Sequence, residues 1–255
     1  MKVTINQPYF LPYIGLMEKA KFADLFVVND YSPISLMRRI HRRVKIMEGF
    51  KSPTAKFITE WVYSTNDGKP FNKILLDDNF YRRIKEIINS IQHAYARAKF
   101  FDYLSDDLFR QLQDPKPKTL GEFNFKLIEL LLKKLNIKTK TILASQSGLF
   151  DEKDLNMTPD GFKNHGTYMA FRMCQITRAT KYISGQSGPK YLDEKPFENN
   201  GIGILYQKIG FSSYPQFNFV EKDFLPGLSI IDLIFHCGPG SEKFVGQNSV
   251  FLSKI

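Results

Sequence analysis

Short apolar segments alternate with helical patterns at both ends of this chain, and this alternation limits the possible folds more than any other feature. Near the N-terminus we predict a strand at 2–6, a helix at 13–22 and a strand at 25–29. Later in the chain, strands at 139–144 and 182–184 are separated by a helix at 165–179. Strand–helix–strand order favours parallel strands covered by helices. We therefore expect an α/β fold with a mainly parallel, Rossmann-like sheet flanked by helices.

The middle of the chain has a different pattern and predicts an inserted α+β subregion at about 43–114. The expected elements are β-like segments at 43–48, 54–60 and 72–77 and helices at 79–98 and 100–112. After a proline-containing linker at 114–118, the pair Thr119 and Glu122 has the spacing of a capping box at the start of another helix. Because α/β chains of about 250 residues often fold as one domain, we expect a single domain over 1–255 that contains this subregion.

The charge balance favours an anionic partner. Lys and Arg outnumber Asp and Glu by 36 to 26, and the net charge of +10 suits phosphate-bearing ligands, nucleic acid or an anionic membrane surface. The densest basic cluster comprises Arg38, Arg39, His41, Arg42, Arg43 and Lys45. Within it, Arg42 and Arg43 are candidate phosphate contacts, although a solvated loop or strand edge has the same composition.

Two further patterns bear on the compartment and on metal binding. No uninterrupted apolar run approaches the roughly 20 residues of a membrane span, and the first residues lack a signal-peptide pattern, so we expect a cytoplasmic protein. Cys174 and Cys237 have no metal-ligand spacing, and we expect no metal site.

Polar pairs end four of the predicted strands. These pairs are Asn6-Gln7, Asn29-Asp30, Ser145-Gln146 and Ser184-Gly185. The carboxyl ends of parallel strands share one edge of a sheet, where open α/β sheets bind their ligands. We therefore expect Gln7, Asp30, Ser145 and Ser184 to line one cleft. Turn-forming residues are common after any strand, so a structural role for each pair stays open.

The segment YISGQSGPKYLD, residues 182–193, predicts a phosphate-binding turn. Gly185 and Gly188 would adopt backbone geometry open to glycine and bring amide groups close to an anion, and Lys190 would add charge. A glycine-rich hairpin turn is the alternative interpretation, because the segment is neither a P-loop nor a dinucleotide-binding fingerprint. The Ser184 hydroxyl has no recognisable base and is not a predicted nucleophile.

An apolar helix pattern at 228–237 ends at Gly238-Pro239 and carries His236 and Cys237 near its end. The dipole at a helix C-terminus would favour a protonated imidazole at His236, which is compatible with a purely structural role. We interpret Cys237 as a small core residue.

Several of these segments together resemble the WbqC-like protein family. The segment NQPYFLPYIGLMEK at 6–19 is similar to the family opening H-Q-P-x-Y-L-P-W-x-G-x-x-x-K. Further similar segments are ADLFVVND (23–30), RVKI (43–46), AYARAKFFDYL (94–104), LGEFNFKLIELLLKKLNIKT (120–139), YISGQSGPKYLD (182–193) and LSIIDLIFHCGP (228–239). The resemblance covers nearly the whole chain.

The resemblance implies a role in bacterial surface polysaccharide. Members of this family occur in gene clusters for O-antigen and related polymers, and a transfer of glycine or another aminoacyl group to an amino sugar has been proposed for some. The resemblance thus implies a transferase acting on a nucleotide-linked amino sugar. No cofactor is firmly implied; ATP, a thioester or a charged tRNA as the activated aminoacyl donor stays open, as does the oligomeric state.

Two alternatives remain beside this function: a nucleotidyl or adenylate-forming transferase, and a nucleotide-sugar-binding protein without catalysis. The second is favoured by Asn6, which stands where the family has His and cannot act as a general base. If the two positions were adjacent, His236 could supply the missing imidazole. The candidate catalytic residues are Asp30, His236 and Gln7. The candidate substrate-binding residues are Asn6, Tyr9, Arg42, Arg43, Ser145, Ser184, Gly185, Gly188 and Lys190.

Overall fold

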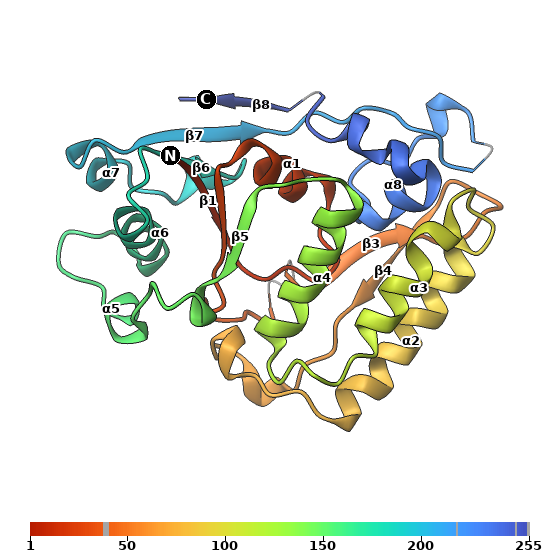
Figure 1. Cartoon of the computed structure of the whole chain (residues 1–255), viewed down its shortest axis with the longest axis horizontal. Helices are drawn as coiled ribbons and strands as arrows, with labels where there is room; N and C mark the ends of the chain where they lie inside the picture. The colour runs from red at the N-terminus through yellow and green to blue at the C-terminus, as the bar shows by residue number, and fades with distance from the viewer. Residues whose placement is uncertain (38–40, 218, 248, 254–255) are drawn as a thin grey trace.

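The computed structural model describes residues 1–37, 41–217, 219–247 and 249–253, and it is built on one six-stranded sheet (Figure 1). The strand order is β5-β2-β1-β6-β7-β8. The strands are β1 (Lys2–Asn6), β2 (Leu25–Val28), β5 (Lys140–Leu143), β6 (Lys181–Ser184), β7 (Gly203–Lys208) and β8 (Val250–Leu252). All neighbouring pairs are parallel except β7 and β8. The predicted α/β fold with a mainly parallel sheet is confirmed.

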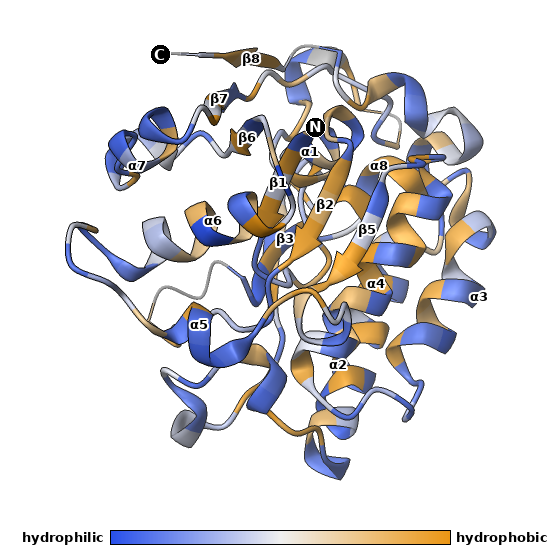
Figure 2. Ribbon diagram, turned by 60° about the vertical axis from the view of Figure 1, so that its left-hand side comes forward, coloured by the Kyte–Doolittle hydropathy of each residue, from blue (hydrophilic) through white to orange (hydrophobic). Residues whose placement is uncertain are grey.

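Helices cover both faces of this sheet. One face carries α1 (Ile14–Phe22), α2 (Asp78–Tyr95), α3 (Phe101–Leu112), α4 (Leu120–Lys134) and α8 (Ile230–Cys237); the other carries α5 (Glu152–Asn156), α6 (His165–Ile176) and α7 (Lys195–Asn199). In β2, Phe26 and Val28 enter the first core while Leu25 and Val27 enter the second. The central strands are therefore apolar on both faces, as Figure 2 shows.

The inserted subregion contains a second sheet, formed by the antiparallel pair β3 (Arg43–Met47) and β4 (Ala55–Thr59). The predicted strand at 72–77 is wrong. A short 3-10 turn (Phe71–Lys73) occurs there instead, and Leu75 makes only an isolated bridge to Thr119. Phe71 and Ile74 are both buried, so their side chains follow the spacing of a helical turn rather than the alternation of a strand.

The helix ends follow the chemistry expected from the sequence. The predicted capping box at the start of α4 is present, because the Thr119 side chain accepts from the Glu122 amide and the Glu122 carboxylate accepts from the Thr119 amide. Helix α8 ends at Gly238, whose φ of 52° favours glycine. A Cβ at that position would also lie 2.5 Å from the Phe100 ring. Among the described residues, no helix is long and apolar enough to cross a membrane.

The order of the strands creates a switch point between β1 and β6. From β1 the chain builds outward through β2 and β5 on one side, and it later returns to add β6 and β7 on the other side. The loops that follow β1 and β6 therefore leave the sheet next to each other but lead away in opposite directions. In open α/β sheets, this is the place where ligands bind.

Candidate functional site

The structure places the four predicted polar strand ends at the same edge of the sheet. Strands β1, β2, β5 and β6 are mutually parallel neighbours, so Gln7, Asp30, Ser145 and Ser184 all follow the carboxyl ends of adjacent strands. Two groups of contacts form along this edge. One joins the ends of β2 and β5, and the other lies at the switch point between β1 and β6.

The first group is centred on the Asp30 carboxylate. Asp30 is fully buried and accepts hydrogen bonds from the Ser145 amide at 3.0 Å and from the Ser145 hydroxyl at 2.5 Å. Burial raises the pKa of Asp30, and the two bonds from Ser145 oppose that rise. Gly121 lets the start of α4 approach Asp30 closely, since a Cβ at position 121 would lie 2.8 Å from the Asp30 Cβ. The carboxyl group is thus fixed in place by donors from the turn after β5.

Gln7 lies in the loop after β1 and contacts the loop after β2, which begins near Asp30. Its Nε2 donates weakly to the Pro33 carbonyl at 3.4 Å, whereas its Oε1 is buried and has no hydrogen-bond partner among the described residues. A buried amide oxygen without a donor is costly, and a bound ligand could supply that donor. Gln7 is therefore suited to contacting a ligand group such as an amine or hydroxyl.

The second group contains Lys19, a residue that our sequence interpretation missed. Lys19 lies on α1 with only 3% of its surface exposed, and its Nζ donates to Asn6 Oδ1 at 2.5 Å. A Cβ on Gly185 would lie 3.6 Å from the same Nζ, so the amine stands between the ends of β1 and β6. No carboxylate of the described residues forms an ion pair with it. Burial alone lowers the pKa of Lys19 to about 7.

The neighbouring Glu18 is also buried, but its charge is compensated. Its carboxylate accepts from Gln207 Nε2, the Ser249 hydroxyl and the Gly246 amide. Every residue of α1 from Ile14 to Ala20 is buried, and this helix reaches solvent only at Lys21 and Phe22. The available signal in the sequence was the lysine that ends the motif at 6–19, which is Lys19.

The glycine-rich turn after β6 is packed more tightly than expected. Neither Gly185 nor Gly188 has a positive φ, so the expectation that both adopt glycine-specific backbone geometry is wrong. Gly188 is needed for a different reason. A Cβ there would lie 2.2 Å from Ser184 Oγ and 2.8 Å from the Tyr206 ring on β7. Lys190 is exposed at the end of the turn (Gly188–Lys190).

Ser184 is buried at the end of β6. Its hydroxyl makes no hydrogen bond of normal geometry with the described residues, yet it is near enough to the Tyr191 phenol to lower the pKa of that phenol against the larger effect of burial. None of these contacts with the described residues pairs the Ser184 hydroxyl with a base.

The loop that connects β1 to α1 is held rigidly by distant parts of the chain. Asn124 Nδ2 donates to the Pro8 carbonyl at 3.2 Å, and the Ser229 hydroxyl donates to the Leu11 carbonyl at 2.8 Å. Leu11 has a φ of 40°, which is unfavourable for leucine and is maintained by these surroundings. Tyr9 packs edge-on against His41 with 4.7 Å between ring centroids, and burial raises the pKa of its phenol. The loop is therefore preorganised at the site.

The basic cluster divides into buried and exposed parts. Arg42 is buried and its Nη1 donates to the Glu60 carbonyl at 2.8 Å, so we correct the expectation that it is an exposed phosphate contact. Burial raises the pKa of Glu60 to about 8, and the Arg42 charge opposes that rise. Arg43 is exposed, and its guanidinium lies 3.8 Å from the centroid of the Phe57 ring. Arg38 and Arg39 lie outside the described residues.

His236 lies in another buried cluster. Its Nδ1 is 2.8 Å from the Asp232 carbonyl, and its ring packs edge-on against Phe217 and Tyr95. Asn6 instead contacts Lys19. The structure does not bring His236 to Asn6, so the imidazole is not positioned to replace the missing histidine of the family motif.

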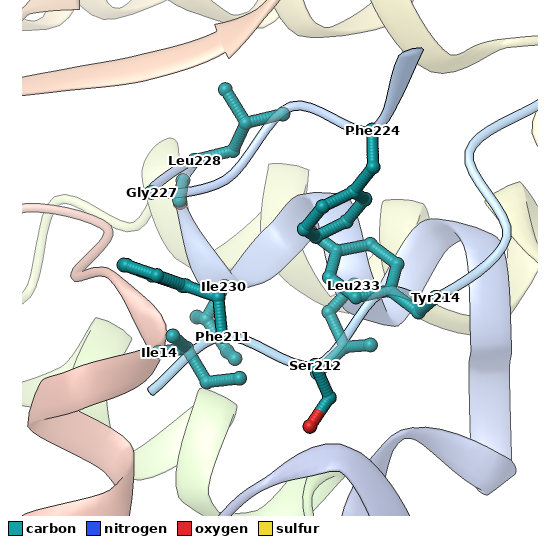
Figure 3. Close-up of a pocket in the computed structure, with 10 residues that line it drawn as sticks. Ile14, Phe211, Ser212, Tyr214, Phe224, Gly227, Leu228, Ile230 and Leu233 are labelled. Carbon is teal, nitrogen blue, oxygen red and sulfur yellow. The ribbon is translucent and has the colours of Figure 1, made fainter. Parts of the chain in front are cut away.

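A small pocket lies beside α8 rather than at the carboxyl edge (Figure 3). Its lining includes Ile14, Phe211, Tyr214 and Leu233, and its volume of about 10 Å³ is about enough for one water molecule. No predicted site residue lines it. The carboxyl edge is therefore the stronger candidate, because the predicted polar strand ends and the buried Lys19 amine lie there.

The comparisons with known proteins agree with the resemblance described above. The model of the WbqC-like protein family matches residues 7–244. A Mycobacterium tuberculosis protein described as uncharacterized protein Rv1507c is 22% identical over 256 residues, covering 96% of this chain and 97% of that protein. No solved structure gives a significant match.

Proposed function

Because the chain belongs to the WbqC-like protein family, we propose that it is a transferase that adds a glycyl or other aminoacyl group to a nucleotide-linked amino sugar. The product would serve bacterial surface polysaccharide such as O-antigen. The observation that supports this function best is the polar chemistry at the switch point between β1 and β6, where open α/β sheets bind nucleotides. Nucleotide-linked sugars are made in the cytoplasm, so the proposal places the protein there.

The reaction requires a base and an oxyanion site. The sugar amine would attack the acyl carbonyl carbon, a C–N bond would form, and the C–O or C–S bond to the donor would break with its electron pair leaving on the donor. A base must take the proton lost by the amine. Asp30 is a candidate base because burial raises its pKa, and the Gln7 amide is a candidate donor to the oxyanion. The donor would be a charged tRNA, a thioester or an adenylate formed from ATP.

A binding protein without catalysis is a second candidate, because Asn6 replaces the histidine of the family motif and its side-chain oxygen is already occupied by Lys19. The two functions differ in turnover, not in binding. Nucleotidyl transfer, the third possibility, would instead release pyrophosphate from ATP.

The test combines binding with mass spectrometry. The protein would be titrated with a uridine- or thymidine-diphosphate sugar that carries a free amine, and with its N-acetylated counterpart as the control. We expect binding of the amino sugar and, with glycyl-tRNA or a glycyl thioester present, a product heavier by one glycyl residue. Asp30→Asn should retain binding and lose turnover. Binding without product for every donor would support the non-catalytic protein, and pyrophosphate release from ATP would support nucleotidyl transfer.

A further inference from the structure

The Lys19 amine is a buried potential charge that the described part of the protein leaves without a counter-ion. Its hydrogen bond goes to the neutral Asn6 side chain, whereas the adjacent Glu18 carboxylate receives three donors. An isolated cation in a protein interior is unfavourable unless an anion accompanies it. A ligand with negative charge would complete this arrangement.

The position of Lys19 gives an anion a route to the amine. Asn6 and Gly185 are both partly exposed and border the switch point. Gly185 has no side chain, and a Cβ at that position would stand 3.6 Å from Lys19 Nζ. A larger residue there would fill the space beside the amine. The absence of a side chain at Gly185 thus leaves room for a small group beside the buried amine at the carboxyl edge.

We propose that Lys19 is the cationic centre of a phosphate-binding site between Asn6 and Gly185, and that a phosphate group binds there together with the uptake of a proton by the Lys19 amine. The identification of that phosphate as part of a nucleotide-linked sugar rests on the proposed function. The phosphate site itself depends only on the geometry around Lys19.

None of the other charged side chains near Lys19 acts as a counter-ion for its amine. On α1, Glu18 is bonded by Gln207, Ser249 and Gly246, and Lys21 Nζ donates to the carbonyls of Glu242 and Val245. The groups that reach Lys19 from β1 and from the turn after β6 are the neutral Asn6 and Gly185. Burial is the only cause of the lowered pKa of Lys19. The amine would therefore respond strongly to an incoming anion.

The proton uptake follows from the protonation state of the free protein. With a pKa of about 7, roughly one tenth of the Lys19 amines carry a proton at pH 8. A phosphate in contact with the amine favours the charged form and raises its pKa. Binding at pH 8 should then take up about half a proton or more, and binding at pH 6, where the amine is already charged, should take up about one tenth of a proton.

The experiment uses UDP and ADP as probes, because their phosphates are almost fully ionised at pH 8. Titration calorimetry in two buffers with different ionisation enthalpies, at pH 8 and again at pH 6, gives the number of protons taken up. Lys19→Met should weaken binding about 10- to 100-fold, the usual loss for a charge-assisted contact, and should abolish the proton uptake. Lys190→Met tests the competing site on the exposed turn after β6, and Lys85→Met, at an exposed lysine of α2, is the matched control that should leave affinity and proton uptake unchanged.

The lysine variants distinguish a phosphate site at Lys19 from a phosphate site on the exposed turn after β6. Loss of affinity in Lys190→Met with unchanged affinity in Lys19→Met would place the phosphate on the exposed turn and overturn the proposal. The proposal would also be overturned if neither nucleotide bound the wild-type protein, or if both bound without proton uptake at pH 8. Lys19-dependent binding without any aminoacyl transfer would retain the phosphate site and remove the transferase.

Discussion

Replacing Lys19 with methionine should make the protein more stable, and the gain should depend on pH. Methionine has a similar length and no charge, so it can occupy the same buried space. The folded protein lowers the pKa of Lys19 from its ordinary value of 10.5 to about 7, which means that the unfolded chain binds more protons between these two pH values. Wild-type stability should therefore rise as the pH increases from about 7 to 10, whereas this contribution is absent in Lys19→Met.

The magnitude follows from the size of the shift. A difference of about 3.5 pKa units corresponds to about 4 kcal/mol of lost stability at pH 7, and the loss falls to below about 1 kcal/mol near pH 10. The variant also loses the hydrogen bond to Asn6 and leaves the Asn6 side-chain oxygen without that donor, which costs about 1 to 2 kcal/mol. Lys19→Met should thus gain roughly 2 to 3 kcal/mol at pH 7 and nothing, or a small loss, at pH 10.

Urea unfolding of both proteins at pH 7, 8.5 and 9.5 measures this difference directly. Lys85→Met is the control, because it makes the same lysine-to-methionine replacement at an exposed position on α2. A constant difference between wild type and Lys19→Met over this pH range would refute the reasoning. So would a control variant with the same pH dependence as Lys19→Met.

Three further predictions concern other buried positions. Because burial raises the pKa of Glu60 to about 8, wild-type stability should fall as the pH rises from about 4.5 to 8. The gain of Glu60→Gln over wild type should therefore grow from about 1 kcal/mol at pH 5 to about 4 kcal/mol at pH 8, measured by urea unfolding. Arg42→Ala should lower stability by about 2 to 4 kcal/mol, whereas Arg43→Ala should change it by less than about 0.5 kcal/mol; equal losses would contradict the burial of Arg42. Gly188→Val should lower stability by about 3 kcal/mol, because the valine side chain would overlap an aromatic ring on β7. The control in thermal melts is Gly240→Val, which should change stability little because a Cβ at position 240 meets nothing within 4 Å.

Local sequence patterns predicted the features that depend on interactions between residues close together in the chain. The capping box at Thr119 and Glu122 involves residues three apart, and the end of α8 at Gly238 is set by backbone conformation, so both were visible in the sequence. The parallel sheet followed from the order of strands and helices, and it implied that Asp30 and Ser145 would meet at one edge. A hydrogen bond between these two residues is present.

Contacts between distant segments determined the rest. The segment at 72–77 resembles a strand by composition, yet it forms a helical turn because Phe71 and Ile74 both reach the core. Arg42 and Arg43 are adjacent and identical in chemistry, and only the pairing of β3 with β4 puts one beside Glu60 and the other in solvent.

Lys19 shows most clearly which properties the sequence determined and which depended on the tertiary structure. The sequence determined that Lys19 lies on the short helix after the first strand, beside Glu18, and the βα order determined which edge of the sheet would carry polar groups. Whether the amine reached solvent, a carboxylate or a neutral side chain depended on packing between α1, β1 and the turn after β6, which are up to 179 residues apart along the chain. Because the free energy of a charge is set by everything that surrounds it, only the tertiary structure decided that this lysine has a neutral partner and a pKa of about 7.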